Sequence, residues 1–338
     1  MDVSTLLDGL NDKQRDAVAA PRCNLLVLAG AGSGKTRVLV HRIAWLMQVE
    51  RCSPFSIIAV TFTNKAAAEM RGRVEKVIGD GVRGMWIGTF HGLCNRFLRA
   101  HHRDAGLPQL FQILDSGDQL AAIKRLLKTL NIDDEKFPPR DLQHFINGQK
   151  EAGLRPAAVE AWDDYTRRRV ELYMEYEAQC QREAVVDFPE LLLRSYELLE
   201  RNEPIRRHYQ ARFRHILVDE FQDTNRLQAG LLLAMRPDGR GLTVVGDDAQ
   251  SIYSFRGATV RNILDFPGQF STPARRITLD RNYRSTQPIL AAANAVIAQA
   301  KERFSKDLWS ERISGEKPRL VSLRDESDQA AWVVDQVL

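Results

Sequence analysis

Short apolar runs and longer amphipathic segments alternate along the chain. Leu25 to Leu28 form a continuous apolar run, and apolar residues then recur at the spacing of one helix face, at Val38, Leu39, Ile43, Leu46 and Met47. This pattern predicts a buried strand over 25–28 and a helix over 37–49. On the same grounds, further strands are predicted over 56–63, 85–90, 215–220, 242–247 and 275–280, and a further helix over 64–79. Continuous apolar strands that alternate with helices indicate a parallel sheet covered on both faces, which is an α/β fold.

The region between residues 91 and 214 has a different pattern. It consists of long amphipathic segments separated by prolines, which predicts a mainly helical structure. Because strand patterns precede and follow it, we expect a helical domain inserted into the α/β domain at a surface loop, where insertions are tolerated.

Composition adds constraints on size and location. With 338 residues, of which 44% are hydrophobic, the chain can form more than one folded domain. Its four cysteines are scattered without a Cys-x-x-Cys pair, so no zinc site or disulfide framework is predicted, and a reducing cytoplasm is favoured. No apolar run approaches the ~20 residues of a membrane span, and the N-terminus does not resemble a signal peptide. We therefore expect a soluble cytoplasmic protein with no membrane partner.

Charge alone does not identify a partner. The chain has 48 lysines and arginines against 44 aspartates and glutamates, too small an excess to indicate nucleic acid. Basic residues are locally enriched over 96–103 and 254–286, but each stretch could be a solvated face.

A glycine-rich loop follows the first predicted strand. Gly30, Gly32 and Gly34 precede Lys35 and Thr36, as in a phosphate-binding loop, except that Ala29 stands where the template has its first glycine. We expect the loop to bind the phosphates of ATP, through its residues Ala31, Gly32, Ser33, Gly34, Lys35 and Thr36. Lys35 would neutralise the outer phosphates and the Thr36 hydroxyl would ligate Mg²⁺. The alternative is a glycine-rich turn before a helix.

Polar residues follow two other predicted strands. Asp219 and Glu220 end the run at 215–220, and Gln250 follows the run at 242–247. The carboxyl ends of parallel strands meet at one edge of a sheet, so these residues are expected near Lys35. Asp219 would hold Mg²⁺ opposite Thr36, Glu220 would take a proton from an attacking water, and Gln250 would contact the γ-phosphate or that water. Alternatively, the two acids merely cap a strand.

Tyr253, Phe255 and Arg256 follow the glutamine closely. Alternating aromatic residues usually mark a strand that packs into a core. The interleaved arginine makes base stacking, worth about 1–3 kcal/mol per base, a competing interpretation.

Seven stretches occur in the order found in the superfamily 1 DNA helicases of the UvrD, Rep and PcrA type, which the chain resembles over essentially its whole length. They are LNDKQRDAV, AGAGSGKT, TFTNKAAAEM, GTFHG, ILVDEFQDT, VVGDDAQSIYSFRGA and LDRNYRST. Alanine is common at the first loop position in this family, so Ala29 fits. The resemblance implies a RecA-like P-loop NTPase domain (1A, residues 1–89 and 215–280), an inserted helical domain (1B, 90–214) and the start of a second RecA-like domain (2A, 281–338).

The resemblance also implies roles for single residues. Gln14 would read the adenine edge, Arg37 and Tyr283 would sandwich the adenine ring, and Arg73 would lie near the nucleotide. The catalytic residues would be Lys35, Glu220, Gln250 and Arg284, the last two on the γ-phosphate. Single-stranded DNA would run along Phe62, Thr89, His91, Tyr253, Phe255 and Arg256. Family members often have tryptophan in place of Phe255, so stacking here would use a smaller ring.

The implied activity is ATP-driven 3′→5′ movement along single-stranded DNA and unwinding of duplex DNA in bacterial repair and replication. Nucleotide excision and mismatch repair, junction DNA and repair proteins belong to this expectation, as does a nucleoid-associated cytoplasmic location. The family's later motifs do not occur here, so we expect an N-terminal fragment with a truncated 2A that binds ATP and DNA weakly and does not unwind. The alternatives are a P-loop ATPase of another class, such as a kinase or transport ATPase, and a non-catalytic DNA-binding or protein-docking module.

Overall fold

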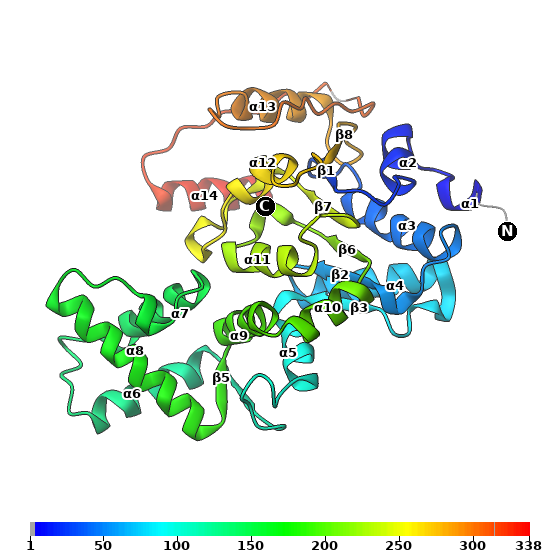
Figure 1. Cartoon of the computed structure of the whole chain (residues 1–338). Coiled ribbons are helices and arrows are strands. Elements are labelled where there is room, and N and C mark those ends of the chain that lie inside the picture. The colour runs from blue at the N-terminus through cyan, green and yellow to red at the C-terminus, as the bar shows by residue number, and fades with distance from the viewer. Residues whose placement is uncertain (1–3, 314) are drawn as a thin grey trace.

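A six-stranded parallel sheet forms the centre of the molecule (Figure 1). The computed structural model describes residues 4–313 and 315–338. The strand order is β3-β2-β6-β7-β1-β8, and the strands are β1 (Leu25–Ala29), β2 (Ile57–Thr61), β3 (Trp86–Thr89), β6 (His215–Val218), β7 (Leu242–Gly246) and β8 (Arg275–Leu279). Every residue of β1, β2, β6 and β7 is buried, as expected for strands that are apolar throughout. The predicted strands and the α/β class are thus confirmed.

Helices cover both faces of the sheet. Alternate residues of β1 point to opposite sides: Leu25 and Val27 join one core, while Leu26 and Leu28 join the other. The first core includes residues of α2 (Asp12–Val18), α3 (Lys35–Gln48) and α4 (Asn64–Ile78). The second core includes residues of α5 (Phe90–Ala100), α9 (Phe188–Arg201), α10 (Glu203–Arg212), α11 (Arg226–Met235) and α12 (Arg261–Asp265). This sheet between two helical layers brings the carboxyl ends of six strands to one edge.

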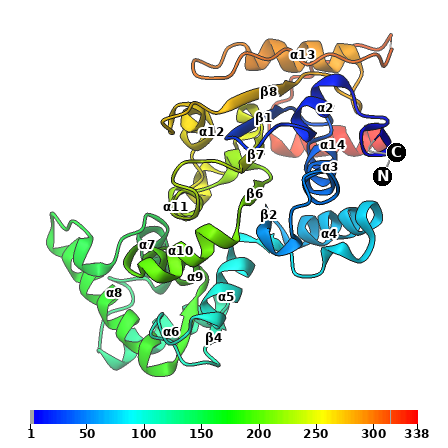
Figure 2. The same cartoon turned by 45° about the vertical axis from the view of Figure 1, so that its right-hand side comes forward.

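The region between β3 and β6 extends away from the sheet (Figure 2). Its outer part is formed by α6 (Ser116–Thr129), α7 (Pro139–Glu151) and α8 (Asp164–Glu183), which pack around a hydrophobic core of their own. A parallel pair of short strands, β4 (Gln112–Leu114) and β5 (Val185–Asp187), was not predicted from the sequence. The helices α5, α9 and α10 of the same region share the core of the sheet. The exact division at residues 90 and 214 stays a prediction.

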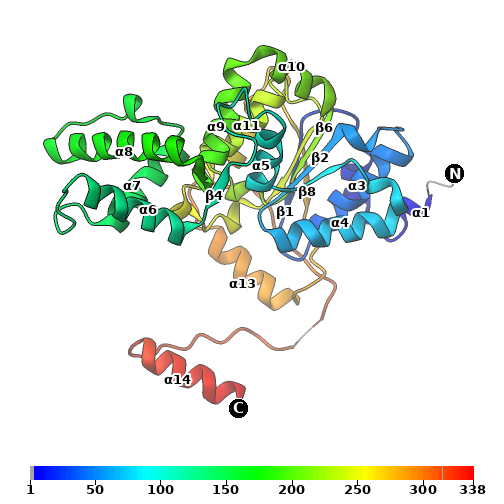
Figure 3. The ribbon, with the colours of Figure 1, turned by 90° about the horizontal axis from the view of Figure 1, so that it is seen from below.

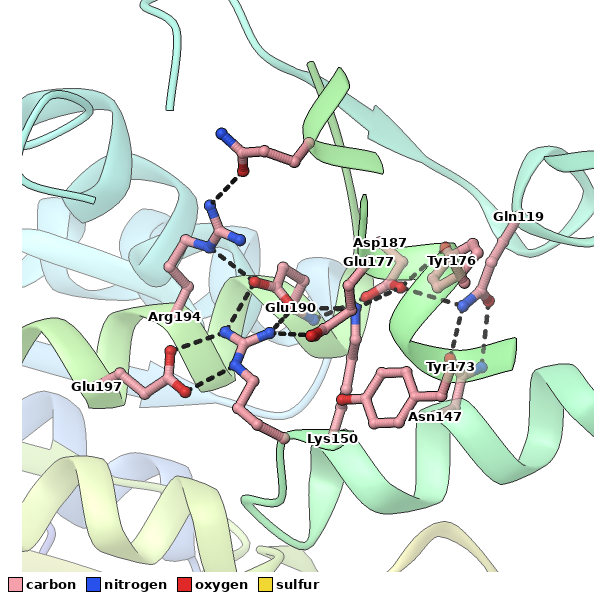
Figure 4. Close-up of polar contacts among 12 residues, drawn as sticks. Gln119, Asn147, Lys150, Tyr173, Tyr176, Glu177, Asp187, Glu190, Arg194 and Glu197 are labelled. Carbon is pink, nitrogen blue, oxygen red and sulfur yellow. Dashed lines mark hydrogen bonds and ion pairs between the residues drawn. The ribbon is translucent and has the colours of Figure 1, made fainter. Parts of the chain in front are cut away.

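Buried charges connect the helices of this region (Figure 4). Lys150 is only 1% exposed, and its Nζ lies 2.9 Å from Asp187 Oδ2 and 2.9 Å from Glu190 Oε2. Arg155 binds the same Glu190 through two hydrogen bonds of 2.9 Å and also contacts Glu177 and Glu197. The network links α7, α8, β5 and α9.

The last part of the chain is the most exposed. It contains α13 (Gln287–Ile297) and α14 (Glu326–Val337), and Figure 3 shows α14 apart from the rest of the molecule. The run at 318–323, which reads as a strand, does not form one, and Leu320 is 96% exposed because no strand of the described residues pairs with this run. At the other end lies the short α1 (Ser4–Leu7). Within the described residues, no helix combines the length and apolarity needed to cross a membrane.

Candidate nucleotide site and single-strand interface

A pocket of about 410 Å³ opens at the carboxyl edge of the sheet, where α3 begins. It is lined by Ala31, Gly32, Gly34, Lys35, Thr36, Arg37, Arg73, Glu220, Gln250, Tyr283 and Arg284. Every one of these residues was predicted from the sequence to belong to the nucleotide site. The structure therefore gathers them from the glycine loop, from α4, from the ends of β6 and β7, and from the segment after β8.

The glycines of the loop are required by backbone conformation and by close contacts. Gly32 and Gly34 have positive φ angles of 76° and 92°. A Cβ on Gly32 would lie 2.6 Å from Cβ of Arg284, and a Cβ on Gly34 would lie 2.6 Å from Nε2 of Gln14. Gly34 is the N-cap of α3 and offers no side-chain cap, so the first amides of the helix can bind an anion.

Lys35 and Glu220 form the polar centre of the pocket, and the buried Asp219 precedes Glu220 without lining the pocket. Lys35 Nζ lies 2.6 Å from Glu220 Oε2. Glu220 has a φ of 49°, a left-handed conformation that is strained for a residue with a side chain. Burial, reinforced by the charge of Glu220 and opposed by Lys35, raises the pKa of Asp219 to about 6. Such strain and such a raised pKa are typical of functional sites.

Gln222 connects the ends of β6 and β7, and the sequence analysis did not identify it. Its Nε2 donates to Glu220 Oε2 at 2.9 Å and to Asp223 Oδ2 at 3.2 Å, and its Oε1 accepts from the backbone N–H of Asp247 at 3.0 Å. Gln250 lies on the next turn, where its Nε2 donates to Asp247 Oδ2 at 2.6 Å. Glu220, Gln222 and Gln250, the expected phosphate sensor, thus belong to one hydrogen-bonded network.

The segment after β8 lies against the glycine loop through Asn282, which the sequence analysis also missed. Asn282 Nδ2 donates to the carbonyl of Ala31 at 2.5 Å, and the N–H of Tyr283 donates to the carbonyl of Gly32 at 2.9 Å. Asn282 Oδ1 accepts from the N–H of Arg284 at 2.8 Å. These contacts hold Tyr283 and Arg284 at the pocket.

The side chains of Gln14 and of the loop residue Ser33 are buried and do not line the pocket. Gln14 is 1% exposed, forms a capping box with Asn11 and donates to the carbonyl of Ser33 at 2.9 Å. The Ser33 hydroxyl donates to the carbonyl of Gly30 at 2.7 Å. Both side chains shape the loop in this structure, and contact of Gln14 with adenine stays a prediction.

Unlike Gln14 and Ser33, Arg37 and Arg73 line the nucleotide pocket. Arg73 comes from α4, and its guanidinium also donates to Glu69 at 3.4 Å.

A second pocket, of about 220 Å³, includes Phe62, Thr89 and His91. Its other walls are Thr61, Phe90, Glu151, Leu192, Asp223, Asn225 and Gln228. The Thr89 hydroxyl also caps α5 by accepting from the N–H of Gly92 at 3.2 Å. Burial lowers the pKa of His91, because it disfavours the charged ring. Asp223 lines this pocket and contacts Gln222, so hydrogen bonds link the second pocket to the first.

Aromatic side chains continue from the second pocket. Phe62 stacks on Tyr253 with ring centroids 5.7 Å apart, and Tyr253 lies 5.8 Å from Phe255, which is 76% exposed. The side chain of Arg256, also expected on the DNA path, lies outside the described part of the chain. Phe188, the first residue of α9, meets His91 edge-on at 5.8 Å and is 46% exposed. The sequence analysis missed Phe188 because it reads as one apolar position of an amphipathic helix.

The fold and the loop define the class of protein. A parallel sheet with a glycine loop between β1 and α3 and paired acids after β6 is an α/β fold of the RecA-like P-loop NTPase type.

The chain belongs to the UvrD/REP helicase family. The family model of the UvrD/REP helicase N-terminal domain matches residues 10–271, and that of the UvrD-like helicase C-terminal domain matches residues 277–338. The resemblance seen in the motifs is thereby confirmed. This membership favours a helicase over a P-loop kinase or a transport ATPase.

Curated relatives carry matching names. The chain is 55% identical to DNA helicase II of Escherichia coli (strain K12), an alignment that covers 100% of this chain and 47% of that protein. It is 41% identical to ATP-dependent DNA helicase PcrA of Staphylococcus aureus (strain Mu50), covering 99% of this chain and 46% of that protein. It thus spans about half the length of the curated relatives it matches. Among solved structures, Pif1 helicase from Candida albicans matches 81% of this chain and 40% of that chain, at 13% identity and a TM-score of 0.36.

Proposed function

We propose that this chain carries the ATP site and the single-strand-binding surface of an ATP-dependent 3′→5′ DNA helicase. The observation that carries the proposal is the single pocket in which the glycine loop meets Lys35, Glu220, Gln250 and Arg284. The names of the relatives, DNA helicase II and ATP-dependent DNA helicase PcrA, agree with it.

In this proposal, each group at the pocket has one task. The loop amides and the start of α3 bind the phosphates, and Lys35 neutralises the outer ones. Glu220 accepts a proton from the attacking water, while Gln250 and Arg284 contact the γ-phosphate. Arg37 and Tyr283 sandwich the adenine ring, Gln14 reads its edge, and Arg73 lies nearby.

Thr36 and Asp219 are the residues that would hold Mg²⁺. The raised pKa of Asp219 fits this role, because a buried carboxylate that lacks sufficient compensation gains from a cation. When bound, the ion neutralises charge that develops on the phosphates.

Single-stranded DNA would stack on the row formed by Phe62, Tyr253 and Phe255, with Thr89, His91 and Arg256 along the same path. The contacts from Asp223 through Gln222 to Glu220 then join the DNA pocket to the ATP pocket. Action at single-strand/double-strand junctions, in excision and mismatch repair and in replication, with repair proteins, in the bacterial cytoplasm, is proposed from the family resemblance.

Binding of a fluorescent ATP analogue to this chain, with and without Mg²⁺ and oligo-dT, tests the proposal. We expect Lys35→Ala to weaken binding by about tenfold or more, since it removes a charge-assisted contact to phosphate. Lys65→Ala, an exposed lysine on α4, is the matched control and should bind as the unmodified chain does. Equal affinity of the Lys35→Ala variant and the unmodified chain would contradict an ATP site in this pocket.

The DNA part of the proposal needs its own measurement, for which anisotropy of labelled oligo-dT is suitable. Phe255→Ala should lower the affinity about fivefold or more, because stacking on one base is lost. An unchanged affinity would remove the exposed aromatic row from the DNA path. Oligo-dT binding that ATP analogues leave unaffected would favour a non-catalytic DNA-binding module.

A further inference from the structure

A lysine from the C-terminal part of the chain is buried under the edge of the nucleotide pocket. Lys306 lies beyond α13 and is 7% exposed. Its Nζ lies 2.6 Å from Asp248 Oδ1 and also contacts Asp247 Oδ1. The N–H of Phe304 donates to the other oxygen of Asp248 at 3.0 Å. A segment far along the chain thus supplies the cation for two adjacent buried carboxylates.

Asp247 is shared between Lys306 and the expected phosphate sensor. One of its oxygens contacts Lys306, and the other accepts from Gln250 Nε2 at 2.6 Å. Asp247 and Asp248 are only 3% and 9% exposed, so their negative charges need a nearby cation. Without Lys306, Asp247 would keep an uncompensated negative charge next to Gln250, beside a pocket that is expected to bind phosphates.

The segment that carries Lys306 is fixed on both sides. Leu308 packs so closely on the glycine loop that a Cβ on Gly30 would lie 2.6 Å from Leu308 Cδ1. Asn294 of α13 donates to the carbonyl of Leu308 at 2.9 Å and accepts from its N–H at 3.2 Å. The N–H of Trp309 donates to the carbonyl of Asp280 at 3.0 Å. Lys306 is therefore held in place by its own segment.

We propose that Lys306 is a positioning residue of the nucleotide site, which neutralises Asp247 and thereby sets Gln250 to recognise the terminal phosphate. This inference rests on the proposed ATP-binding function. It gives the region after residue 281 a contribution to the pocket beyond those of Asn282, Tyr283 and Arg284. Because Lys306 acts through Gln250, its effect is specific to nucleotides that carry a γ-phosphate.

The test compares the affinities of this chain for a fluorescent non-hydrolysable ATP analogue and for the matching ADP analogue. We expect Lys306→Met to weaken ATP-analogue binding about tenfold and ADP-analogue binding less than threefold, since one charge-assisted contact to the sensor is disturbed. The matched control is Lys301→Met, an exposed lysine five positions earlier, which should change neither. In a Gln250→Ala background, Lys306→Met should no longer alter the ATP-to-ADP preference.

A merely structural Lys306 would weaken both analogues equally, or neither, and either result overturns the inference. If Lys306→Met does not fold, Asp247→Asn decides. It keeps an oxygen acceptor for Gln250 but loses the ion pair with Lys306 that fixes the orientation of that oxygen, and should shift the preference in the same direction by a smaller factor. The Lys35→Ala variant separates the two proposals. If Lys35→Ala binds the ATP analogue as the unmodified chain does, the proposed function fails. If Lys35→Ala loses binding but Lys306→Met keeps the normal preference for the ATP analogue over the ADP analogue, only the role of Lys306 fails.

Discussion

Buried charges gather in two parts of this molecule, and they are compensated to different degrees. In the network around Lys150, burial alone would raise the pKa of Glu190, but Lys150, Arg155 and Arg194 outweigh it and hold that pKa below its ordinary value (Figure 4). Around the nucleotide pocket, burial and the charge of Glu220 outweigh Lys35, so the pKa of Asp219, and that of Asp223 in the adjoining hydrogen-bond network, rise to about 6.

The two regions also differ in their polar contacts. Asp187 accepts hydrogen bonds from Lys150, Tyr176 and Gln119, and its other oxygen caps α9. In the second pocket, which hydrogen bonds link to the nucleotide pocket, Asp223 Oδ1 is among the described polar atoms that are buried without a hydrogen-bond partner. The first region is a closed network that fixes helices, whereas the second keeps charge and backbone strain where a ligand would meet them.

The largest expected effect comes from breaking the closed network. Lys150→Met leaves Asp187 and Glu190 buried without their lysine, and should lower the free energy of unfolding by about 3–5 kcal/mol. Urea denaturation, with hydrogen exchange of α7 and α9, measures the loss. Arg168→Ala, which breaks an exposed pair with Glu171, is the control and should cost less than about 1 kcal/mol.

A companion variant tests the cause of that loss. Lys150→Met combined with Asp187→Asn and Glu190→Gln removes the uncompensated charges, so it should be less destabilised than the single variant. If Lys150→Met alone loses under about 1 kcal/mol, the network does not hold these helices together.

At the nucleotide pocket, removing the charge of the buried Asp219 should raise the free energy of unfolding instead of lowering it. The folded pKa of Asp219, about 6 against an ordinary 3.8, means that the folded chain binds more protons between these values. Its stability contribution is therefore lost as the pH rises from about 4 to 6. Asp219→Asn should raise the free energy of unfolding at pH 7.5 by about 1–3 kcal/mol and abolish Mg²⁺-dependent nucleotide binding.

Denaturation at several pH values checks this sign. The advantage of Asp219→Asn over the unmodified chain should shrink toward pH 4, where the aspartate is protonated. Asp134→Asn, at an exposed position, should show no such trend. A destabilised Asp219→Asn variant at pH 7.5 would mean that Lys35 compensates Asp219 fully.

The sheet and the pocket could be predicted from sequence because their signals are local. Several strands of the sheet are continuous apolar runs, and parallel strands bring their carboxyl ends to one edge, so the loop and the acids were expected together. The strands β4 and β5, of three residues each, are too short to show a period. The run at 318–323 has the composition of a strand but no partner strand, and pairing, not composition, makes a strand.

The contacts that complete the pocket could not be predicted, because they depend on tertiary distance. Asn282 reaches the loop from 251 residues away, and Lys306 reaches Asp248 from 58 residues away. Lys150 was missed for a related reason: a lysine on an amphipathic helix is ordinarily solvated, and only the fold surrounds this one with carboxylates. Buried polar networks thus carry information that hydrophobic periodicity does not contain.

The smallest expected effect compares backbone strain in the two regions. Ala184, at the C-cap of α8, and Glu220 both have left-handed backbones, with φ angles of 58° and 49°. Ala184→Gly should stabilise the chain by about 0.5–1 kcal/mol, because glycine adopts this conformation without steric cost and only part of the gain is lost to the entropy of the unfolded chain.

At position 220 the matched comparison is Glu220→Gly against Glu220→Ala, since both variants lose the contact with Lys35 and differ only in the Cβ. The glycine variant should be more stable than the alanine variant by a similar amount, about 0.5–1 kcal/mol, as measured by urea denaturation. Both should lose hydrolysis if Glu220 is the proton acceptor. An equal gain in stability at positions 184 and 220 would mean that the backbone strain is the same at both. Glu220 would then differ only because its side chain is needed at the pocket and is lost when the strain is relieved. If Glu220→Gly is no more stable than Glu220→Ala, the left-handed backbone at the pocket is not strained, and the contrast between the two regions rests on their charges alone.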